Sequence, residues 1–289
     1  MKKVLITGAN SYIGCSFEAY VREHYPDVLS VDVVEMKDGT WRTKDFSKYD
    51  VVFHVAGLAH ADVGNVSDEV KSKYYKVNTE LAIETAKKAK ADGVKQFVFM
   101  SSMIVYGGLE YITRETVPQP ANFYGDSKWQ ADKGIRELQD DRFCVSVLRP
   151  PMIYGKGSNG NYPVLAKHAK KLPVFPKVNN KRSMLYIENL CEFLCVIMKD
   201  TKAGVFWPQN KELVNTSSMV KEIAAFNGHK IWVTSLLTPF VMVGKKVPGK
   251  IGDLCRKAFG SSYYELEMSE CGFEYCVVSM KDSICKTEG

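Results

Sequence analysis

Short apolar runs alternate with longer amphipathic segments from residue 3 to about residue 150, and no other feature constrains the fold of this chain as strongly. Continuous apolar runs are typical of strands that are buried on both faces of a sheet. The predicted strands cover residues 3–7, 28–34, 51–55, 96–101 and 143–148. The predicted helices between them cover residues 11–24, 68–92 and 124–139. This order predicts an α/β fold with a doubly wound parallel sheet.

The rhythm of the chain changes after Pro150. Proline, glycine and asparagine cluster at residues 155–160 and 173–180, helical segments continue, and strand-like runs become sparse. We therefore predict two lobes, a Rossmann-type domain over residues 1–155 and a smaller α/β lobe over residues 156–289.

The charge of the chain argues against a nucleic-acid partner. Lys and Arg outnumber Asp and Glu by 39 to 33, which gives a net charge of +6, but the basic residues are scattered. No apolar run is long enough to span a membrane, and the chain enters its first strand-like run without the apolar region of a signal peptide. The eight cysteines contain no C-x-x-C pair, which predicts reduced thiols, no metal site and a cytoplasmic protein.

The segment from Leu236 to Gly260 has two interpretations. Its basic residues stand among apolar ones and are Lys245, Lys246, Lys250, Arg256 and Lys257. One interpretation is an amphipathic element that lies on a membrane surface. The other, which we expect, is a solvated helical face of the small lobe.

The first predicted strand leads into the turn TGANSYIG at residues 7–14, which opens a helix. The free N–H groups and the positive dipole end of such a helix bind a pyrophosphate. A full fingerprint has three glycines, whereas Ser11 stands at the middle position here and adds a Cβ where close backbone approach is usual. The predicted cofactor contacts are Gly8, Asn10, Ser11, Tyr12, Ile13 and Gly14. The alternative is a tight strand-to-helix turn without a ligand.

An acidic residue near the end of the second strand is expected to bind the hydroxyls of the adenosine ribose. Asp32, which lies 18 residues after Gly14, is the first choice, and Glu35 is the second. A carboxylate repels a 2'-phosphate, so the acid favours NAD over NADP. Lys37 nearby keeps NADP possible.

The third predicted strand ends in His-Val-Ala-Gly at residues 54–57. The small residues Ala56 and Gly57 allow the backbone to lie against the cofactor. We expect His54 to be a core histidine with a hydrogen-bond partner and not a catalyst.

A tyrosine and a lysine follow the fourth strand at helical spacing. Tyr124 and Lys128 stand at i and i+4 of the predicted helix, so the ammonium group can lie beside the phenol. The pKa of a tyrosine near 10 must fall by about 3 for the side chain to act as a base at neutral pH, which corresponds to about 4 kcal/mol. The Lys128 charge and the positive nicotinamide of an oxidised cofactor can supply this stabilisation. Ser101 and Ser102 place hydroxyls at the carboxyl edge of the sheet, where ligands bind.

Four motifs together resemble the extended short-chain dehydrogenase/reductase family. They are the Thr-Gly turn, SSMIVYG at residues 101–107, YGDSK at residues 124–128 and LRPPMIYG at residues 148–155. Within this family the chain is similar to the NAD-dependent nucleotide-sugar epimerase/dehydratase branch, including UDP-glucose 4-epimerases, from residue 1 to at least residue 230.

The resemblance implies a role for each matching residue. It implies that Ser102 is the catalytic hydroxyl, that Tyr124 is the base, and that Lys128 holds the nicotinamide ribose. It assigns further cofactor contacts to Asn78 and Pro151. The 4,6-dehydratases of the branch carry Asp-Glu directly after the hydroxyl. Met-Ile stands at residues 103–104 here, so dehydration is not expected.

The resemblance also reaches the small lobe. It implies that Arg182 and Asn161 contact the diphosphate of the substrate, and that Phe175 lines the site of the nucleotide base. The guanidinium group of arginine suits phosphate oxygens, although a surface ion pair is the alternative for Arg182. The predicted helices at 68–92 and 124–139 resemble a pair that forms a four-helix homodimer interface.

The expected activity is that of an NAD-dependent nucleotide-sugar 4-epimerase, which acts on a UDP-hexose through a 4-keto intermediate. The first alternative is an NAD(P)H-dependent reductase of a nucleotide 4-keto sugar in polysaccharide precursor synthesis. The second alternative is a regulator that binds a dinucleotide without chemistry, although Ser102, Tyr124 and Lys128 are all present. The sequence gives no signal for the sugar.

Overall fold

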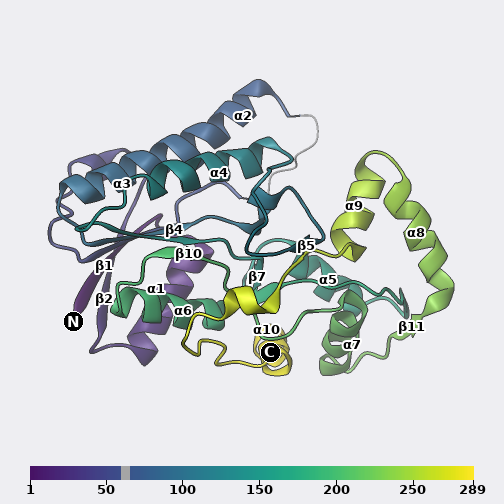
Figure 1. The fold of residues 1–289 in the computed structure, drawn as a ribbon. Helices are drawn as coiled ribbons and strands as arrows, with labels where there is room; N and C mark the ends of the chain where they lie inside the picture. Colours follow the sequence, from purple (N-terminus) through teal and green to yellow (C-terminus); the bar gives the residue numbers. More distant parts are fainter. Residues whose placement is uncertain (60–65) are drawn as a thin grey trace.

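A six-stranded parallel sheet forms the centre of the molecule in the computed structural model, which describes residues 1–59 and 66–289 (Figure 1). Its strands lie in the order β10-β6-β4-β3-β1-β2. Their bounds are β1 (Lys2–Thr7), β2 (Leu29–Val34), β3 (Val51–His54), β4 (Gln96–Met100), β6 (Cys144–Leu148) and β10 (Gly204–Phe206). The predicted doubly wound sheet is therefore confirmed, and the five predicted strands agree with the observed ones to within a few residues.

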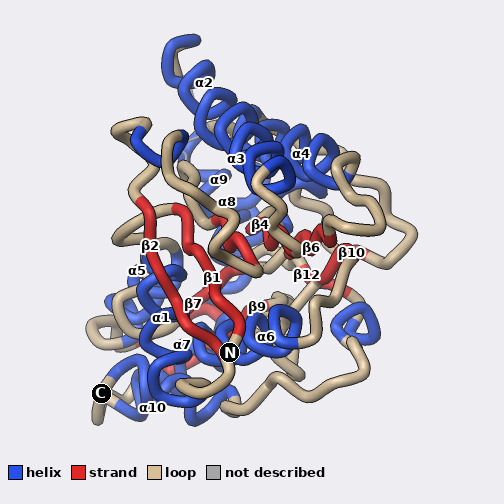
Figure 2. Tube along the Cα trace, turned by 90° about the vertical axis from the view of Figure 1, so that its left-hand side faces the viewer, coloured by secondary structure: helices blue, strands red, loops and turns tan. Residues whose placement is uncertain are grey.

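Helices cover both faces of this sheet, as Figures 1 and 2 show. One face carries α1 (Tyr12–His24) and α6 (Ile187–Lys199), and the other carries α2 (Asp68–Tyr75), α3 (Leu81–Ala91) and α4 (Phe123–Arg136). Side chains of a strand alternate between its two faces. Val4 and Ile6 accordingly belong to one buried cluster and Leu5 to the other. The apolar runs of the sequence are apolar because both faces are covered.

The helix predicted at residues 68–92 is divided in the structure. A π-helical turn (Lys76–Glu80) separates α2 from α3. Such turns are rare and are often found at functional sites. The turn brings Asn78, which is fully buried, toward the carboxyl edge of the sheet.

The strand order places a switch point between β1 and β3, because the chain runs from β1 outward to β2 and then returns past β1 to β3. Thr7 pairs with His54, and His54 with Phe99, so these strands end at the same level. Ligands of doubly wound sheets bind in the crevice at such a point. The register therefore brings the residues after β1, β3, β4 and β6 to one edge.

Short strand pairs and further helices complete the structure, and most of them belong to the second lobe. The pairs are β7 (Met152–Tyr154) with β9 (Met184–Tyr186), β8 (Val174–Pro176) with β11 (Trp232–Thr234), and β5 (Tyr111–Ile112) with β12 (Tyr263–Tyr264). The helices are α5 (Asn161–Ala169), α7 (Thr216–Phe226), α8 (Thr238–Lys246), α9 (Lys250–Phe259) and α10 (Met280–Glu288). The short 3-10 turns are η1 (Thr40–Arg42), η3 (Met103–Tyr106), η4 (Ser235–Leu237) and η5 (Leu266–Ser269).

The chain crosses between the lobes more than once. After residue 155 it returns to the large sheet through α6 and β10, and β12 pairs with β5 of the first lobe. The division at residue 155 remains a prediction for the start of the second lobe. Among the described residues, no helix combines the length and the apolar character needed to cross a membrane.

Candidate active site

The turn after β1 requires glycine at two positions. Gly8 has a φ of +120°, and a Cβ there would lie 2.9 Å from the backbone nitrogen of Ala56. A Cβ on Gly14 would lie 3.2 Å from Ile6 Cγ2 and 2.6 Å from Ser11 Oγ. Gly8 thus lets β1 and the loop after β3 approach closely, and Gly14 lets α1 pack on β1. The glycine turn thus leads directly into the N-terminus of α1, whose first N–H groups have no intrahelical acceptor and fit a dinucleotide pyrophosphate.

Ser11 fits the turn although it replaces the expected middle glycine. Its φ of −74° is ordinary for any residue, and it is the N-cap of α1. The Gly14 backbone N–H donates a hydrogen bond to Ser11 Oγ at 3.2 Å. The N–H groups of Tyr12 and Ile13 lie at the open end of the helix, where no intrahelical acceptor exists. The structure therefore gives no steric reason for Ser11 to disable the turn.

The side chain of Tyr12 points into the protein. Its hydroxyl is buried and lies 2.7 Å from the place that a Cβ on Gly155 would take. Tyr12 can therefore offer the cofactor only its backbone N–H. Asn10 has a φ of +60°, a left-handed conformation that asparagine tolerates.

The two carboxylates expected near the ribose differ in position. Asp32 pairs with Leu5 inside β2, and its side chain accepts a hydrogen bond from the Tyr49 hydroxyl at 2.9 Å. Glu35 follows Val34, whose carbonyl accepts the Gly8 N–H at 3.1 Å. Only Glu35 therefore stands at the carboxyl edge beside the glycine turn. The geometry reverses the expected order and favours Glu35 over Asp32.

The three expected catalytic residues come together at the ends of β4 and α4. Ser102 follows β4 in an extended conformation and caps η3, where its hydroxyl accepts the Ile104 N–H at 3.3 Å. The Ser102 side chain lies near the Tyr124 phenol and acts to lower its pKa. Lys128, one turn further along α4, is buried and donates from Nζ to the Met100 carbonyl at 3.0 Å. Asn122 caps α4 by accepting the Gly125 N–H, which fixes the first turn that carries Tyr124.

We call Ser102, Tyr124 and Lys128 the trio. The pKa values of Tyr124 and Lys128 in the protein alone differ from those expected from the sequence. Burial raises the pKa of Tyr124 to about 12, and the nearby Ser102 side chain opposes the rise only in part. Burial lowers the pKa of Lys128 to about 8. Lys128 donates to a backbone carbonyl here. The expected lowering of the Tyr124 pKa by Lys128 is thus not present in this structure.

Lys128 also affects His54, which is fully buried. Burial and the nearby Lys128 charge lower the pKa of His54 to about 3, and its Nδ1 lies 2.7 Å from Thr7 Oγ1. His54 is therefore a neutral core residue, as expected from the sequence.

Asn78 and Gly57 complete the site around Lys128. The Asn78 side chain accepts the Leu58 N–H at 2.7 Å, and it donates to the Leu58 carbonyl and to Ser127 Oγ at 3.1 Å. A Cβ on Gly57 would lie 3.1 Å from both Lys128 Nζ and Asn78 Oδ1. Glycine at position 57 therefore leaves room for the Lys128 ammonium group and the Asn78 amide beside the loop after β3.

A buried polar network beneath the trio was missed by the sequence analysis. Asp132 of α4 is fully buried and accepts two hydrogen bonds from the Arg149 guanidinium, at 2.8 and 2.9 Å, and one from Ser101 Oγ at 3.0 Å. Arg149 also donates to the Tyr106 hydroxyl at 2.8 Å. The Tyr264 hydroxyl donates to the Arg149 carbonyl, which ties the second lobe to the network. An arginine directly after a buried strand was the available signal.

The three expected substrate contacts lie in different surroundings. The Arg182 guanidinium donates to the carbonyls of Lys257 and Gly260, at the end of α9. The backbone of Arg182 forms an isolated β-bridge with Ser262. The Ser262 hydroxyl in turn donates to Met103 Sδ at 3.5 Å. Arg182 is thus near the loop of Ser102, but its guanidinium caps a helix.

The other two expected substrate contacts, Phe175 and Asn161, differ in their exposure to solvent. Phe175 is buried and its ring packs against Phe259, and its expected place at the nucleotide base remains a prediction. Asn161 is exposed at the first position of α5. Pro151 is buried directly before β7, and the Pro150 carbonyl accepts the Met103 N–H at 2.9 Å.

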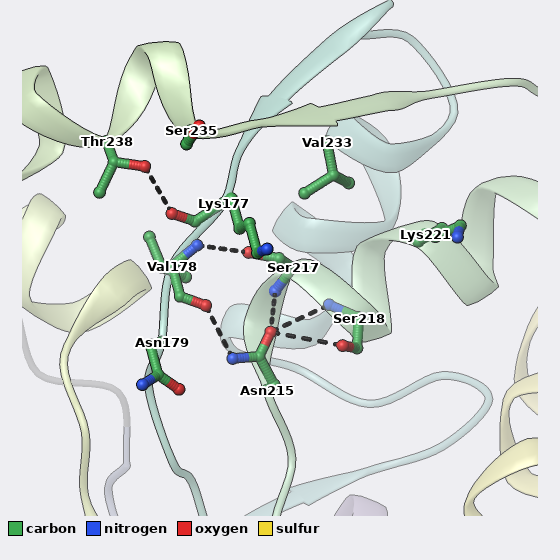
Figure 3. A pocket seen from close by; sticks show the side chains of 10 residues that line it. All are labelled: Lys177, Val178, Asn179, Asn215, Ser217, Ser218, Lys221, Val233, Ser235 and Thr238. Atoms are coloured by element: carbon green, nitrogen blue, oxygen red, sulfur yellow. Dashed lines mark hydrogen bonds between the residues drawn. The ribbon is translucent and has the colours of Figure 1, made fainter.

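A cavity of about 740 Å³ lies in the second lobe, away from the trio (Figure 3). It is lined by Lys177, Val178, Asn179, Asn215, Ser217, Ser218, Lys221, Val233, Ser235 and Thr238. Much of its polar lining serves the fold, because Asn215 accepts the Ser217 and Ser218 N–H groups and donates to the Val178 carbonyl. Ser102, Tyr124 and Lys128 do not line it. We therefore place the active site at the edge of the sheet.

A parallel doubly wound sheet, a glycine turn before α1, and a hydroxyl, a phenol and an ammonium group at one edge define a Rossmann-type enzyme fold. A family model described as the NAD dependent epimerase/dehydratase family matches residues 4–206, and the chain belongs to this family.

Two curated relatives are 4-epimerases. The chain is 27% identical to N-acetyl-alpha-D-glucosaminyl-diphospho-ditrans,octacis-undecaprenol 4-epimerase of Escherichia coli O157:H7, over 90% of this chain and 82% of that protein. It is 29% identical to UDP-glucose 4-epimerase of Vibrio cholerae, over 80% of this chain and 77% of that protein.

Solved structures share the fold. A dTDP-4-dehydrorhamnose reductase from Bacillus anthracis in complex with NADP has a TM-score of 0.75 and 18% identity, over 99% of this chain and 98% of that chain. A UDP-glucuronic acid 4-epimerase from Bacillus cereus in complex with NAD has a TM-score of 0.71 and 16% identity, over 99% and 97%. The chain is therefore similar to enzymes that act on activated sugars, among them epimerases and reductases.

Proposed function

We propose that the protein is an NAD-dependent 4-epimerase of a nucleotide sugar of the UDP-hexose type. The observation that carries the proposal is the convergence of Ser102, Tyr124 and Lys128 at the edge of the sheet, beside Gly57 and the glycine turn. The two curated relatives support it, because both are named as 4-epimerases.

The proposed mechanism assigns one task to each residue. The chemistry that NAD supplies when bound is the reversible uptake of a hydride from sugar C4. Tyr124, as a phenolate, takes the proton of the O4 hydroxyl, and Ser102 donates a hydrogen bond to the same oxygen. Lys128 holds the nicotinamide ribose. After the 4-keto sugar turns over, a hydride returned to the opposite face of C4 would make O4 an alkoxide, and Tyr124 would give the proton back to that oxygen.

We assign the binding of the cofactor and of the substrate to residues that surround Ser102, Tyr124 and Lys128. The turn with Gly8 and Ser11 and the N-terminus of α1 bind the cofactor diphosphate, and Glu35 binds the adenosine ribose. Gly57 allows the cofactor to reach Lys128. Arg182 contacts the substrate diphosphate only if its guanidinium exchanges the carbonyls at the end of α9 for phosphate oxygens.

A second candidate is an NAD(P)H-dependent reductase of a nucleotide 4-keto sugar. The fold shared with the reductase from Bacillus anthracis favours it, over 99% of the chain. The same trio serves both reactions, and the two differ in whether the oxidised cofactor leaves. A regulator without chemistry is less well supported, because Ser102, Tyr124 and Lys128 are all in place.

Two kinds of carrier group are candidates for the substrate: a nucleoside diphosphate and a polyprenyl diphosphate. In the proposed mechanism the sugar carries a diphosphate, and this feature is shared by nucleotide sugars and by polyprenyl diphosphate sugars. The relative from Escherichia coli O157:H7 is named for a substrate of the second kind. We keep the UDP-hexose as the first substrate to test, in polysaccharide precursor synthesis.

The test is to denature the purified protein and measure released dinucleotide by absorbance and mass spectrometry, then to follow UDP-hexose epimerisation by NMR. We expect stoichiometric NAD and interconversion of the 4-epimers. Tyr124→Phe is expected to retain NAD and to lose activity by at least about a hundredfold. Protein that is empty and consumes added NADH or NADPH with a 4-keto sugar would indicate the reductase.

We also propose that the protein is a cytoplasmic homodimer. Its eight cysteines are free thiols, which suits a reducing compartment. The helices α2, α3 and α4 lie side by side on one face of the sheet, where the family resemblance places a four-helix interface (Figure 1). Sedimentation at micromolar concentration is expected to give twice the chain mass of 32.5 kDa, and a monomer would contradict the proposal.

A further inference from the structure

The helices α8 and α9 form a hairpin that projects from the second lobe (Figure 1). The two helices pack closely, since a Cβ on Gly244 of α8 would lie 2.8 Å from Cys255 Sγ of α9. Val241 is buried on the inner side of α8. We call this hairpin, residues 238–259, the arm.

The outer side of α8 is apolar and exposed. Phe240 and Val243 stand at i and i+3 on one face of α8, with exposed fractions of 74% and 65%, and Leu236 of the preceding turn η4 is 71% exposed. Met242 adds a further 57% exposed side chain. We call these four residues the apolar arm face. Trp232 of β11, four residues before Leu236, is also exposed. The segment is helical and exposed, as expected from the sequence, but the exposed side chains of α8 are largely apolar.

The segment that carries the apolar arm face is rich in basic residues. Residues 229–260 contain six lysines and arginines and one acidic residue, whereas the two kinds number 39 and 33 in the whole chain. Lys246 is exposed and Lys245 half-buried at the end of α8, and Lys230 is exposed before β11. Lysines at the edge of an apolar helix face are typical of helices that lie in the interface of anionic membranes.

We infer that the arm docks the protein on an anionic membrane surface. Leu236, Phe240, Met242 and Val243 enter the boundary between headgroups and acyl chains, and the lysines bind lipid phosphates. A projecting apolar edge with aromatic and aliphatic side chains suits a lipid surface, which needs no complementary groove. The net positive charge of this segment selects anionic lipid, because each basic residue near a negatively charged surface adds electrostatic attraction.

The base of the arm lies beside the proposed active site. Arg182 donates to the carbonyl of Lys257 at the end of α9, and Ser262 reaches Met103, the neighbour of Ser102. Docking through the arm would therefore place the substrate opening close to the membrane. This consequence rests on the proposed function, whereas the docking itself does not.

The test is flotation of the purified full-length protein with vesicles of phosphatidylcholine alone and with 30% phosphatidylglycerol, a composition chosen to be about one third anionic. We expect binding to the anionic vesicles that weakens with salt. Phe240→Ser with Val243→Ser is expected to weaken binding at least about tenfold. Lys245→Ala with Lys246→Ala is expected to weaken it about tenfold to thirtyfold, and only on anionic vesicles.

Val117→Ser is the matched control, because Val117 is an exposed valine outside the arm. It is expected to bind vesicles as the wild type does. Thermal unfolding of each variant checks that the fold persists. Absence of wild-type binding, or wild-type binding by the Phe240→Ser, Val243→Ser variant, would overturn the proposal. If neither protein floats with vesicles and the Phe240→Ser, Val243→Ser variant forms a smaller oligomer than the wild type, the arm contacts a second copy of the chain instead. Neither readout uses catalytic activity, so failure of docking and failure of the proposed function are separable.

Discussion

Lys128 is the residue of the proposed site that costs the most folding free energy, because its ammonium group is buried. Lys128 is buried, and its surroundings lower its pKa from 10.5 to about 8. The unfolded chain thus binds more protons than the folded protein between about pH 8 and pH 10.5. The stability of the protein therefore rises with pH across that window, and the full penalty is present below pH 8. In the proposed mechanism this cost is offset by function, because Lys128 is the residue assigned to hold the cofactor ribose beside Tyr124.

Lys128→Met tests this electrostatic argument. We expect the variant to be more stable than the wild type by up to about 3 kcal/mol at pH 7, because the pKa is lowered by about 2.5 and each pKa unit corresponds to about 1.4 kcal/mol. The difference is expected to shrink toward pH 10.5, and epimerase activity is expected to be lost. Urea unfolding at pH 7 and pH 10 gives the measurement. A variant that is less stable than the wild type at pH 7 would contradict the assigned cost.

The choice between Glu35 and Asp32 is also a matter of single residues. Glu35→Gln is expected to weaken NAD binding about tenfold and to reduce the preference for NAD over NADP, since the repulsion of a 2'-phosphate is removed. Asp32→Asn is the matched control. It is expected to keep NAD affinity and to lose about 1 kcal/mol of stability through the Tyr49 hydrogen bond. Calorimetric titration with both dinucleotides distinguishes them, and equal effects of the two variants would restore Asp32 as a candidate.

At the scale of elements, the sequence predicted the strands and helices that are determined by the local pattern of apolar residues and glycines. The strands were predicted because both faces of each are buried, and α1 because Gly8 and Gly14 mark its turn. The π-turn was not predictable, because the segment around Asn78 keeps a helical pattern and only its contact with Leu58 shows the extra residue. The burial of Phe175 against Phe259 depends on a contact 84 residues away, which no local pattern records.

The N-terminus of α1 provides a test at this scale. Ser11 caps α1, so Ser11→Ala is expected to destabilise the protein by about 1 kcal/mol, and Ser11→Gly by only a few tenths. The glycine variant also restores the full fingerprint. We expect it to bind NAD at least as tightly as the wild type, because it frees the Gly14 N–H. Thermal unfolding with and without NAD measures both effects. Much weaker binding by Ser11→Gly would show that the hydroxyl itself contacts the cofactor.

The whole molecule is held together by segments that return from the second lobe. Gln96 of β4 is fully buried and donates to Ser146 of β6 at 2.9 Å and to the Ile197 carbonyl of α6 at 3.1 Å. Lys2 at the start of β1 donates to the Met198 carbonyl at 2.9 Å. The large sheet is therefore fastened to α6, which the sequence rhythm had placed beyond residue 155. Sequence periodicity showed where the strand and helix alternation stopped, but it carried no information on which later helix covers the sheet.

This arrangement predicts that residues 1–155 do not form a stable unit. Without α6 the fragment loses four buried side chains that cover the face of α1, namely Leu190, Phe193, Leu194 and Ile197. Burial of such a side chain stabilises a protein by about 1.5 to 3 kcal/mol, so the loss is comparable to the whole stability of a domain. The fragment also lacks β10, which leaves β6 as an open edge. We expect it to unfold without cooperativity or to aggregate, while the full chain unfolds cooperatively in the same urea titration. A cooperative transition of the fragment would show that the division at residue 155 is a true domain boundary.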